Sequence, residues 1–187
     1  MERISMSKVR GRYRKLNIDR KWIILVLLAA IASIFINLWP LIFLSLFCIL
    51  NAILLSIDRY VQMPVDIEIS TFSAVLMTYS YGLNWGIAAA ILTKLAAILY
   101  NKNVRVDHFF MMGGYVVAAM LANSLAFPSI IMAGIIIAFM VNLYVVFVSK
   151  FITMLSAYEI LMYGTSNFIF NVVLFVGFAD LFRLLMI

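Results

Sequence analysis

The sequence has little charge, little proline and a single cysteine. Only 12% of its 187 residues are charged, whereas 66% are hydrophobic. A soluble domain cannot bury that much apolar surface, so this composition indicates a membrane protein. The apolar residues form long continuous runs instead of alternating, which favours helices over a barrel. We therefore expect an all-α fold, a polytopic transmembrane helical bundle with short hairpin connections.

Sequence signatures of catalysis and of metal binding are also missing. The chain has no Ser/His/Asp set, no HExxH, no P-loop, no GxGxxG and no clustered acidic motif of the phosphotransferase kind. Its lone cysteine, Cys48, excludes an internal disulfide and a cysteine-based metal cluster. The single histidine, His108, lacks the clustered partners of a metal site. We expect a protein that is not an enzyme and that has no metal site and no cofactor.

Much of the basic charge is concentrated at the N-terminus. Eight of the 14 basic residues precede Trp22, namely Arg3, Lys8, Arg10, Arg12, Arg14, Lys15, Arg20 and Lys21. A basic segment next to an apolar helix is typical of a cytoplasmic anchor of a multi-pass protein, and it favours the lipid bilayer over nucleic acid as its partner. We divide the chain into a basic cytoplasmic segment, 1–21, and a single transmembrane domain, 22–187, and expect it in the plasma membrane.

Hydropathy and helix breakers predict six or seven spans. The first six are expected at 22–38, 41–57, 70–81, 85–100, 108–126 and 129–148. The remaining residues predict either one long helix interrupted at Gly164 or a half-helix, 151–163, followed by a full span, 167–186. We favour the break, because Thr165 or Ser166 can cap a new helix. The sequence does not predict on which side of the membrane the C-terminus lies. The basic residues that follow the second, fourth and sixth spans fall on the side of the N-terminus: Arg59, Lys102, Arg105 and Lys150.

Small residues recur at intervals of four along two of these helices. One series comprises Gly82, Gly86 and Ala90, and the other Gly114, Ala118 and Ala122. Such ridges allow helix backbones to approach closely. They indicate either packing inside the bundle or a docking face for a partner membrane protein.

Lys94 is a charged residue deep inside an apolar helix. A charge at membrane depth costs a few kcal/mol, so it requires an explanation. The lysine either extends towards the interface near Tyr100 or pairs with a buried anion. Glu159 is the natural candidate for that anion.

A second polar feature lies near the C-terminus. Glu159, Tyr163, Asn167 and Asn171 are spaced by four residues and share one helix face if the helix is continuous. These side chains either bond between helices or contact a ligand. The candidate solute-binding residues are Glu68, Lys94, Asn142, Glu159, Tyr163, Asn167 and Asn171.

The central stretch resembles the S-components of energy-coupling-factor (ECF) vitamin transporters. The likeness is carried by Met63-Pro64-Val65-Asp66, by Tyr81-Gly82, and by Gly86 with Ala90. It implies a solute-binding membrane subunit that takes up a small polar or vitamin-like molecule with an energising partner. The chain is similar at the same level to MreD-type rod-shape morphogenesis proteins. That similarity implies instead a non-catalytic scaffold that binds other membrane proteins.

Overall fold

Every regular element in the part of the chain that the structure describes is an α-helix. The structure is a computed structural model, and it describes residues 38–61 and 64–186. Six helices are present there: α2 Trp39–Val61, α3 Ser70–Tyr81, α4 Leu83–Asn101, α5 Val106–Ser124, α6 Ile130–Phe151 and α7 Ala157–Met186. The expected all-α class is confirmed for these residues. The span expected at 22–38 lies outside them.

Four of the helices are long and apolar enough to cross a membrane. They contain the segments Trp39–Ile57, Leu83–Asn101, Ile130–Phe151 and Ala157–Met186. Helix α3 has only 12 residues and is therefore ~18 Å long, short of a bilayer core of ~30 Å. The chain is thus compatible with a membrane-embedded helical bundle in which α3 is a shorter, internal element.

The ends of the helices follow local backbone chemistry. Helix α3 ends at Gly82, whose φ of 91° is a conformation that residues with a side chain rarely adopt. Pro40 lies in the first turn of α2, where its missing N–H breaks no helical hydrogen bond. Ser129 caps α6 by accepting a hydrogen bond from the backbone N–H of Met132. The expected start of this helix at residue 129 is therefore confirmed within one residue.

The predicted break at Gly164 is wrong, because α7 is continuous from Ala157 to Met186. Gly164 lies inside the helix, and a side chain there would only touch Val146 of α6. The hydroxyl of Ser166 donates back to the carbonyl of Tyr163 at 3.1 Å, so this serine does not start a new helix. Helix α6 ends at Phe151, and a short connection leads to α7.

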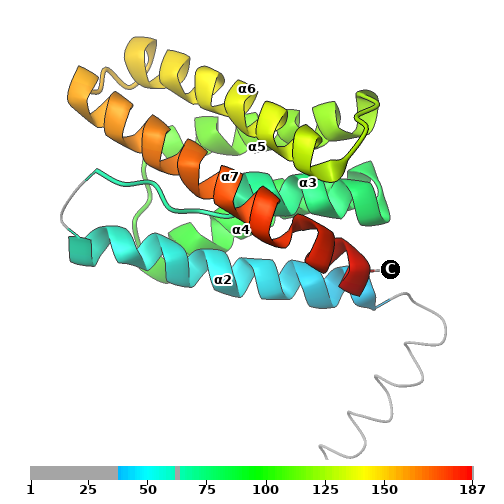
Figure 1. Ribbon diagram of the computed structural model, residues 1–187. Helices are drawn as coiled ribbons and strands as arrows, with labels where there is room; N and C mark the ends of the chain where they lie inside the picture. Colours follow the sequence, from blue (N-terminus) through cyan, green and yellow to red (C-terminus); the bar gives the residue numbers. More distant parts are fainter. Residues whose placement is uncertain (1–37, 62–63, 187) are drawn as a thin grey trace, which may run out of the picture. The chain divides into compact units, whose positions relative to one another are not determined.

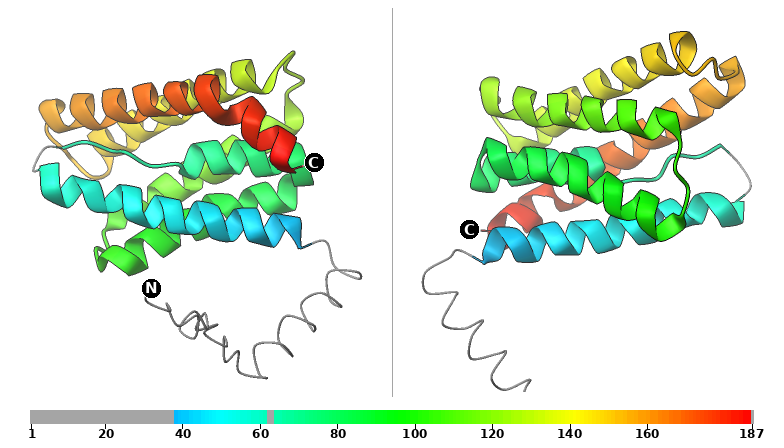
Figure 2. Two further views of the ribbon diagram at one scale, coloured as in Figure 1. Left: turned by 60° about the horizontal axis from the view of Figure 1, so that its bottom comes forward. Right: turned by 180° about the vertical axis from the view of Figure 1, so that it is seen from behind.

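Helix α3 is surrounded by the other helices. It packs against α4 most extensively and also contacts α2, α5, α6 and α7. All of its residues from Ser70 to Thr78 are buried. Phe72 lies in a group of rings, with its centroid 5.0 Å from that of Phe175 on α7. Figure 1 and Figure 2 show α3 and α4 as antiparallel neighbours and α7 crossing α2 obliquely.

The two ridges of small residues lie between helices of this chain. Ala90, Ala118 and Ala122 are buried, as are Gly86 and Gly114. A side chain at Gly86 would overlap with Thr78 of α3, and one at Gly114 would overlap with the ring of Tyr144 of α6. Gly82, the first of the series, is exposed and forms the turn between α3 and α4. Close packing inside the bundle accounts for the spacing of these residues.

We predict that Gly86→Ala destabilises the protein. The added methyl group would meet the Thr78 hydroxyl and the Ala74 carbonyl at the contact of α3 and α4, at a cost of about 1–3 kcal/mol. Thermal unfolding in detergent measures the effect. Gly177→Ala is the matched control, because nothing lies within 4 Å of the added atom and alanine favours the helix. Equal stability of the two variants would contradict this packing.

Candidate functional site

The segment Pro64–Ile69 enters the bundle without helical structure. It runs between α2 and α7 towards the start of α3 (Figure 1). Backbone groups at membrane depth must find partners inside the protein. The N–H of Asp66 donates to the hydroxyl of Ser166 on α7 at 2.9 Å. The N–H of Ile69 donates to the side-chain oxygen of Asn51 on α2 at 2.8 Å.

Asn51 joins three elements through one buried amide. Besides accepting from Ile69, its side chain donates to the hydroxyl of Ser70 and to the carbonyl of Thr93, both at 3.1 Å. The residue is fully buried. It therefore fixes α2, the start of α3 and the middle of α4 relative to one another. Our sequence analysis missed Asn51, although an asparagine within the apolar run LFCILNAILL indicates a buried polar contact.

Lys94 forms a buried ion pair with Glu68. Both side chains are about 1% exposed, and the Lys94 ammonium donates a hydrogen bond to the Glu68 carboxylate. The same ammonium lies 6.0 Å from the ring centroid of Tyr115. The expectation that Lys94 needs a buried anion is confirmed, and extension towards the interface is excluded.

The prediction that Glu159 is the partner of Lys94 is wrong. Glu159 lies in the first turn of α7, where its carboxylate accepts hydrogen bonds from the N–H and the hydroxyl of Ser156 at 2.9 and 2.6 Å. The hydroxyl of Ser156 in turn accepts from the N–H of Glu159 at 3.3 Å. This reciprocal arrangement caps the helix. Glu159 thus has a local role at the start of α7, whereas Glu68 lies on the Pro64–Ile69 segment, which precedes α3.

A network of amides links the same segment to α6 and α7. The amide of Asn167 donates to the Asp66 carboxylate at 3.1 Å. The amides of Asn142 and Asn171 both donate to the side-chain oxygen of Asn167, at 3.2 and 3.1 Å. Because α7 is continuous, Asn167 and Asn171 share its buried face, as their spacing indicates. Tyr163, one turn earlier, is half-buried and interacts with Arg105.

A small polar cavity lies beside this network. Its volume is about 40 Å³, enough for one to about three water-sized groups. Its polar wall consists of Asp66, Lys94, Asn101, Asn103, Arg105, Asp107, His108 and Tyr163, and its apolar wall of Leu55, Val65, Met111 and Leu155. We call this space the polar cavity. Of the predicted site residues, the structure brings Lys94 and Tyr163 to it.

The charges at the mouth of the polar cavity are held in place by a second ion pair. Arg105 donates to both carboxylate oxygens of Asp107, at 3.0 and 2.8 Å. Burial lowers the pKa of Arg105, but the nearby Asp107 carboxylate and Tyr163 raise this pKa by more, so the guanidinium stays charged. The two-point contact fixes the orientation of both side chains.

His108 is the polar residue on the cavity wall that is left unsatisfied. Its side chain is 6% exposed, and its Nδ1 has no hydrogen-bond partner among the described residues. Buried polar atoms nearly always have a partner, either in the protein or in an ordered water molecule. Our sequence analysis did not include this residue among the candidate site residues, because a lone histidine indicates no metal site.

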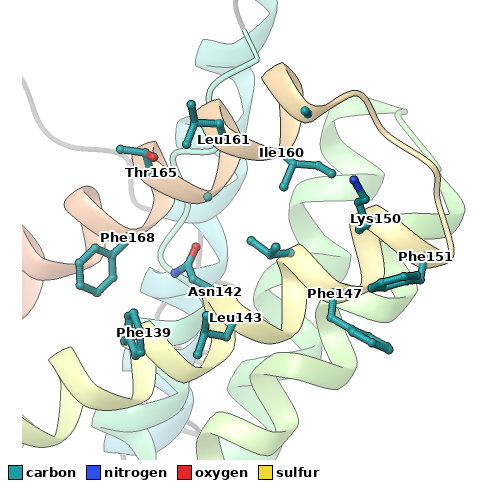
Figure 3. A pocket seen from close by; sticks show the side chains of 13 residues that line it. Phe139, Asn142, Leu143, Phe147, Lys150, Phe151, Ile160, Leu161, Thr165 and Phe168 are labelled. Atoms are coloured by element: carbon teal, nitrogen blue, oxygen red, sulfur yellow. The ribbon is translucent and has the colours of Figure 1, made fainter.

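A larger groove between α6 and α7 differs in character. Its volume is about 670 Å³. Figure 3 shows Phe139, Leu143 and Phe147 of α6 on one side and Ile160, Leu161 and Phe168 of α7 on the other. The one asparagine on its wall, Asn142, already bonds to Asn167 and to the carbonyl of Ala138. An apolar groove of this kind does not fit a polar solute.

The buried ion pair gives a test by double substitution. We predict that Lys94→Met alone destabilises the protein by about 3–5 kcal/mol, because it leaves the Glu68 carboxylate buried without its cation. Adding Glu68→Met should restore most of the stability, since no charge remains buried. Thermal unfolding of the single and double variants measures the coupling.

The control for this cycle is Glu159→Met. It should not rescue Lys94→Met, because Glu159 caps α7 and does not contact the lysine. Rescue by Glu159→Met and not by Glu68→Met would contradict the assigned pair.

Comparisons of this chain with protein-family models, with curated proteins and with solved structures find no match.

Proposed function

We propose that the protein is a solute-binding subunit of a membrane transport system. The polar cavity would hold a small polar solute, and a separate partner would supply the energy. One observation carries the proposal: a space lined by charged groups of both signs lies beside the α4–α5 connection of a bundle whose helices include four that are long and apolar enough to cross a membrane. Ionisable residues at membrane depth are costly, so a wall that gathers several of them points to a ligand or ion path.

The arrangement around the cavity supports this proposal. A proline-containing segment leads into a short helix, a turn at Gly82 follows, and the next helix carries Gly86 and Ala90. This order agrees with the S-component-like pattern of the sequence. In transporters, non-helical backbone at membrane depth commonly lines the binding site. Here the segment Pro64–Ile69 contributes Val65 and Asp66 to the wall.

The volume of the polar cavity limits the solute. Sites for drug-sized molecules occupy ~300–1,000 Å³, far more than the 40 Å³ found here. In this conformation the cavity accepts only a very small solute. A vitamin-like molecule would require the Pro64–Ile69 segment or the start of α7 to move outwards.

The remaining parts of the proposal follow from the sequence. The chain carries no P-loop, so any nucleotide must be hydrolysed by the energising partner. We place the protein in the plasma membrane with a cytoplasmic N-terminus on the basis of its basic N-terminal segment, and we propose six to seven spans on the basis of its hydropathy.

A scaffold of the MreD type is the second candidate function. It is favoured by the hydrogen bonds of the buried asparagines, whose side chains bond to other groups of the protein. Asn142 and Asn171 donate to Asn167, and Asn167 donates to Asp66, so these side chains stabilise the bundle from within. A scaffold needs such locked helices and no free cavity.

A solute screen with a cavity-filling variant separates the two functions. We predict that at least one small polar solute raises the Tm of the purified protein, because a ligand that binds only the folded state stabilises it. Leu155→Phe should abolish this rise by filling the polar cavity without removing a charge. Ile152→Phe, in the same connection but exposed and away from the cavity wall, should leave the rise intact. No shift with any solute would contradict solute binding and favour the scaffold.

A further inference from the structure

The groove between α6 and α7 is apolar over most of its wall and carries one charged side chain. Its polar side chains are Asn142, Lys150 and Thr165, and of these only Lys150 is charged. Four of its apolar side chains are more than half exposed, namely Phe139, Leu143, Phe147 and Leu161. The groove shares no lining residue with the polar cavity, so the two are separate spaces.

The two ends of the groove differ in chemistry. At one end the rings of Phe139 and Phe168 meet edge to face across the two helices, with their centroids 6.0 Å apart. At the other end Lys150 lies in the last turn of α6, beside the connection to α7 (Figure 3). Its side chain is exposed, and it belongs to neither of the two salt bridges among the described residues. The groove therefore runs from an exposed cation to an aromatic contact.

The length of the groove matches one leaflet of a bilayer. Its α6 wall extends from Phe139 to Lys150 and its α7 wall from Ala157 to Phe168, which is about 17 Å of helix on each side. One leaflet contributes half of a hydrocarbon core of ~30 Å, which is ~15 Å. With Lys150 at the level of the lipid headgroups, the aromatic contact lies near the middle of the bilayer.

We infer that the groove binds one anionic phospholipid, with a hydrocarbon chain between α6 and α7 and the phosphate beside the Lys150 ammonium. A volume of about 670 Å³ is within the ~300–1,000 Å³ of common ligand pockets. The apolar wall fits hydrocarbon, and a lysine at the membrane surface attracts an anionic headgroup. Glu159, in the first turn of α7, is not on the groove wall, and its carboxylate is bonded by Ser156. In the orientation proposed above, the lipid belongs to the cytoplasmic leaflet.

Thermal unfolding of the full chain in a neutral detergent tests this inference. Phosphatidylglycerol and phosphatidylcholine with identical chains are compared at equal concentrations. At about ten times the half-saturating concentration, phosphatidylglycerol should raise the Tm by ~4 °C more than phosphatidylcholine, because it binds the folded protein. Native mass spectrometry should show one phosphatidylglycerol retained per chain. Equal Tm values with the two lipids, or no retained phosphatidylglycerol, would overturn the inference.

A charge substitution tests the position of the headgroup. Lys150→Gln should abolish the difference between the two lipids, because the cation at the end of the groove is gone. Lys102→Gln is the matched control, since Lys102 is also exposed and is not on the groove wall. A difference that survives in Lys150→Gln, or that is lost equally in Lys102→Gln, would contradict the assigned position.

A second pair of variants tests the position of the hydrocarbon chain. Gly164→Leu should fill the groove and abolish the shift, and it should still fold, because its Cβ meets only Val146, at 3.7 Å. Gly177→Leu on the same helix, away from the groove and with nothing within 4 Å of its Cβ, should keep the shift. A shift that survives in Gly164→Leu would overturn the inference. A dimer that Gly164→Leu converts to a monomer would also overturn it, because a second copy would then cover the groove.

These outcomes are independent of the proposed solute binding. The solute screen reports on the polar cavity through Leu155→Phe, and Leu155 is not on the wall of the groove. A failed solute screen therefore leaves the lipid site standing, and a failed lipid test leaves solute binding standing.

Discussion

The buried ion pair between Glu68 and Lys94 is the interaction on which this structure depends. A lysine in the middle of an apolar helix is tolerated only when its charge is matched. The carboxylate that matches it lies on a segment with no helical hydrogen bonds of its own. The pair therefore holds the Pro64–Ile69 segment against α4, while Asn51 and Ser166 accept hydrogen bonds from its backbone. Together these contacts allow irregular backbone inside the bundle.

The position of the polar cavity follows from that arrangement. Six residues of non-helical chain reach at most ~20 Å, and α3 adds ~18 Å, so the two together are long enough to match a bilayer core of ~30 Å. Because Pro64–Ile69 is not helical, it leaves room beside α4 and α5, where the polar cavity lies. Side chains from the loop before α5 and from the start of α7 close the remaining space, and the polar cavity is what they leave. The same segment thus shapes the fold and the proposed site.

The sequence predicts the local features of this fold and misses those that depend on distant contacts. The bounds of α3 are predicted correctly, because Gly82 and the polar residues before Ser70 mark its ends. The shared face of Asn167 and Asn171 follows from helical periodicity alone. The partner of Lys94 is predicted incorrectly, because the approach of Glu68 depends on how an irregular segment folds back along α4. The continuity of α7 through Gly164 is missed because neighbouring packing outweighs the weak helix propensity of one glycine.

Amide hydrogen exchange along the Pro64–Ile69 segment tests the central claim most directly. The N–H of Asp66 and the N–H of Ile69 each donate to a side chain from another helix. In the membrane-reconstituted protein, both amides should exchange as slowly as those in the buried part of α3, although the segment is not helical. Exchange as fast as at Val104, which is exposed in the connection between α4 and α5, would show that the segment is not held inside the bundle, and would contradict this account.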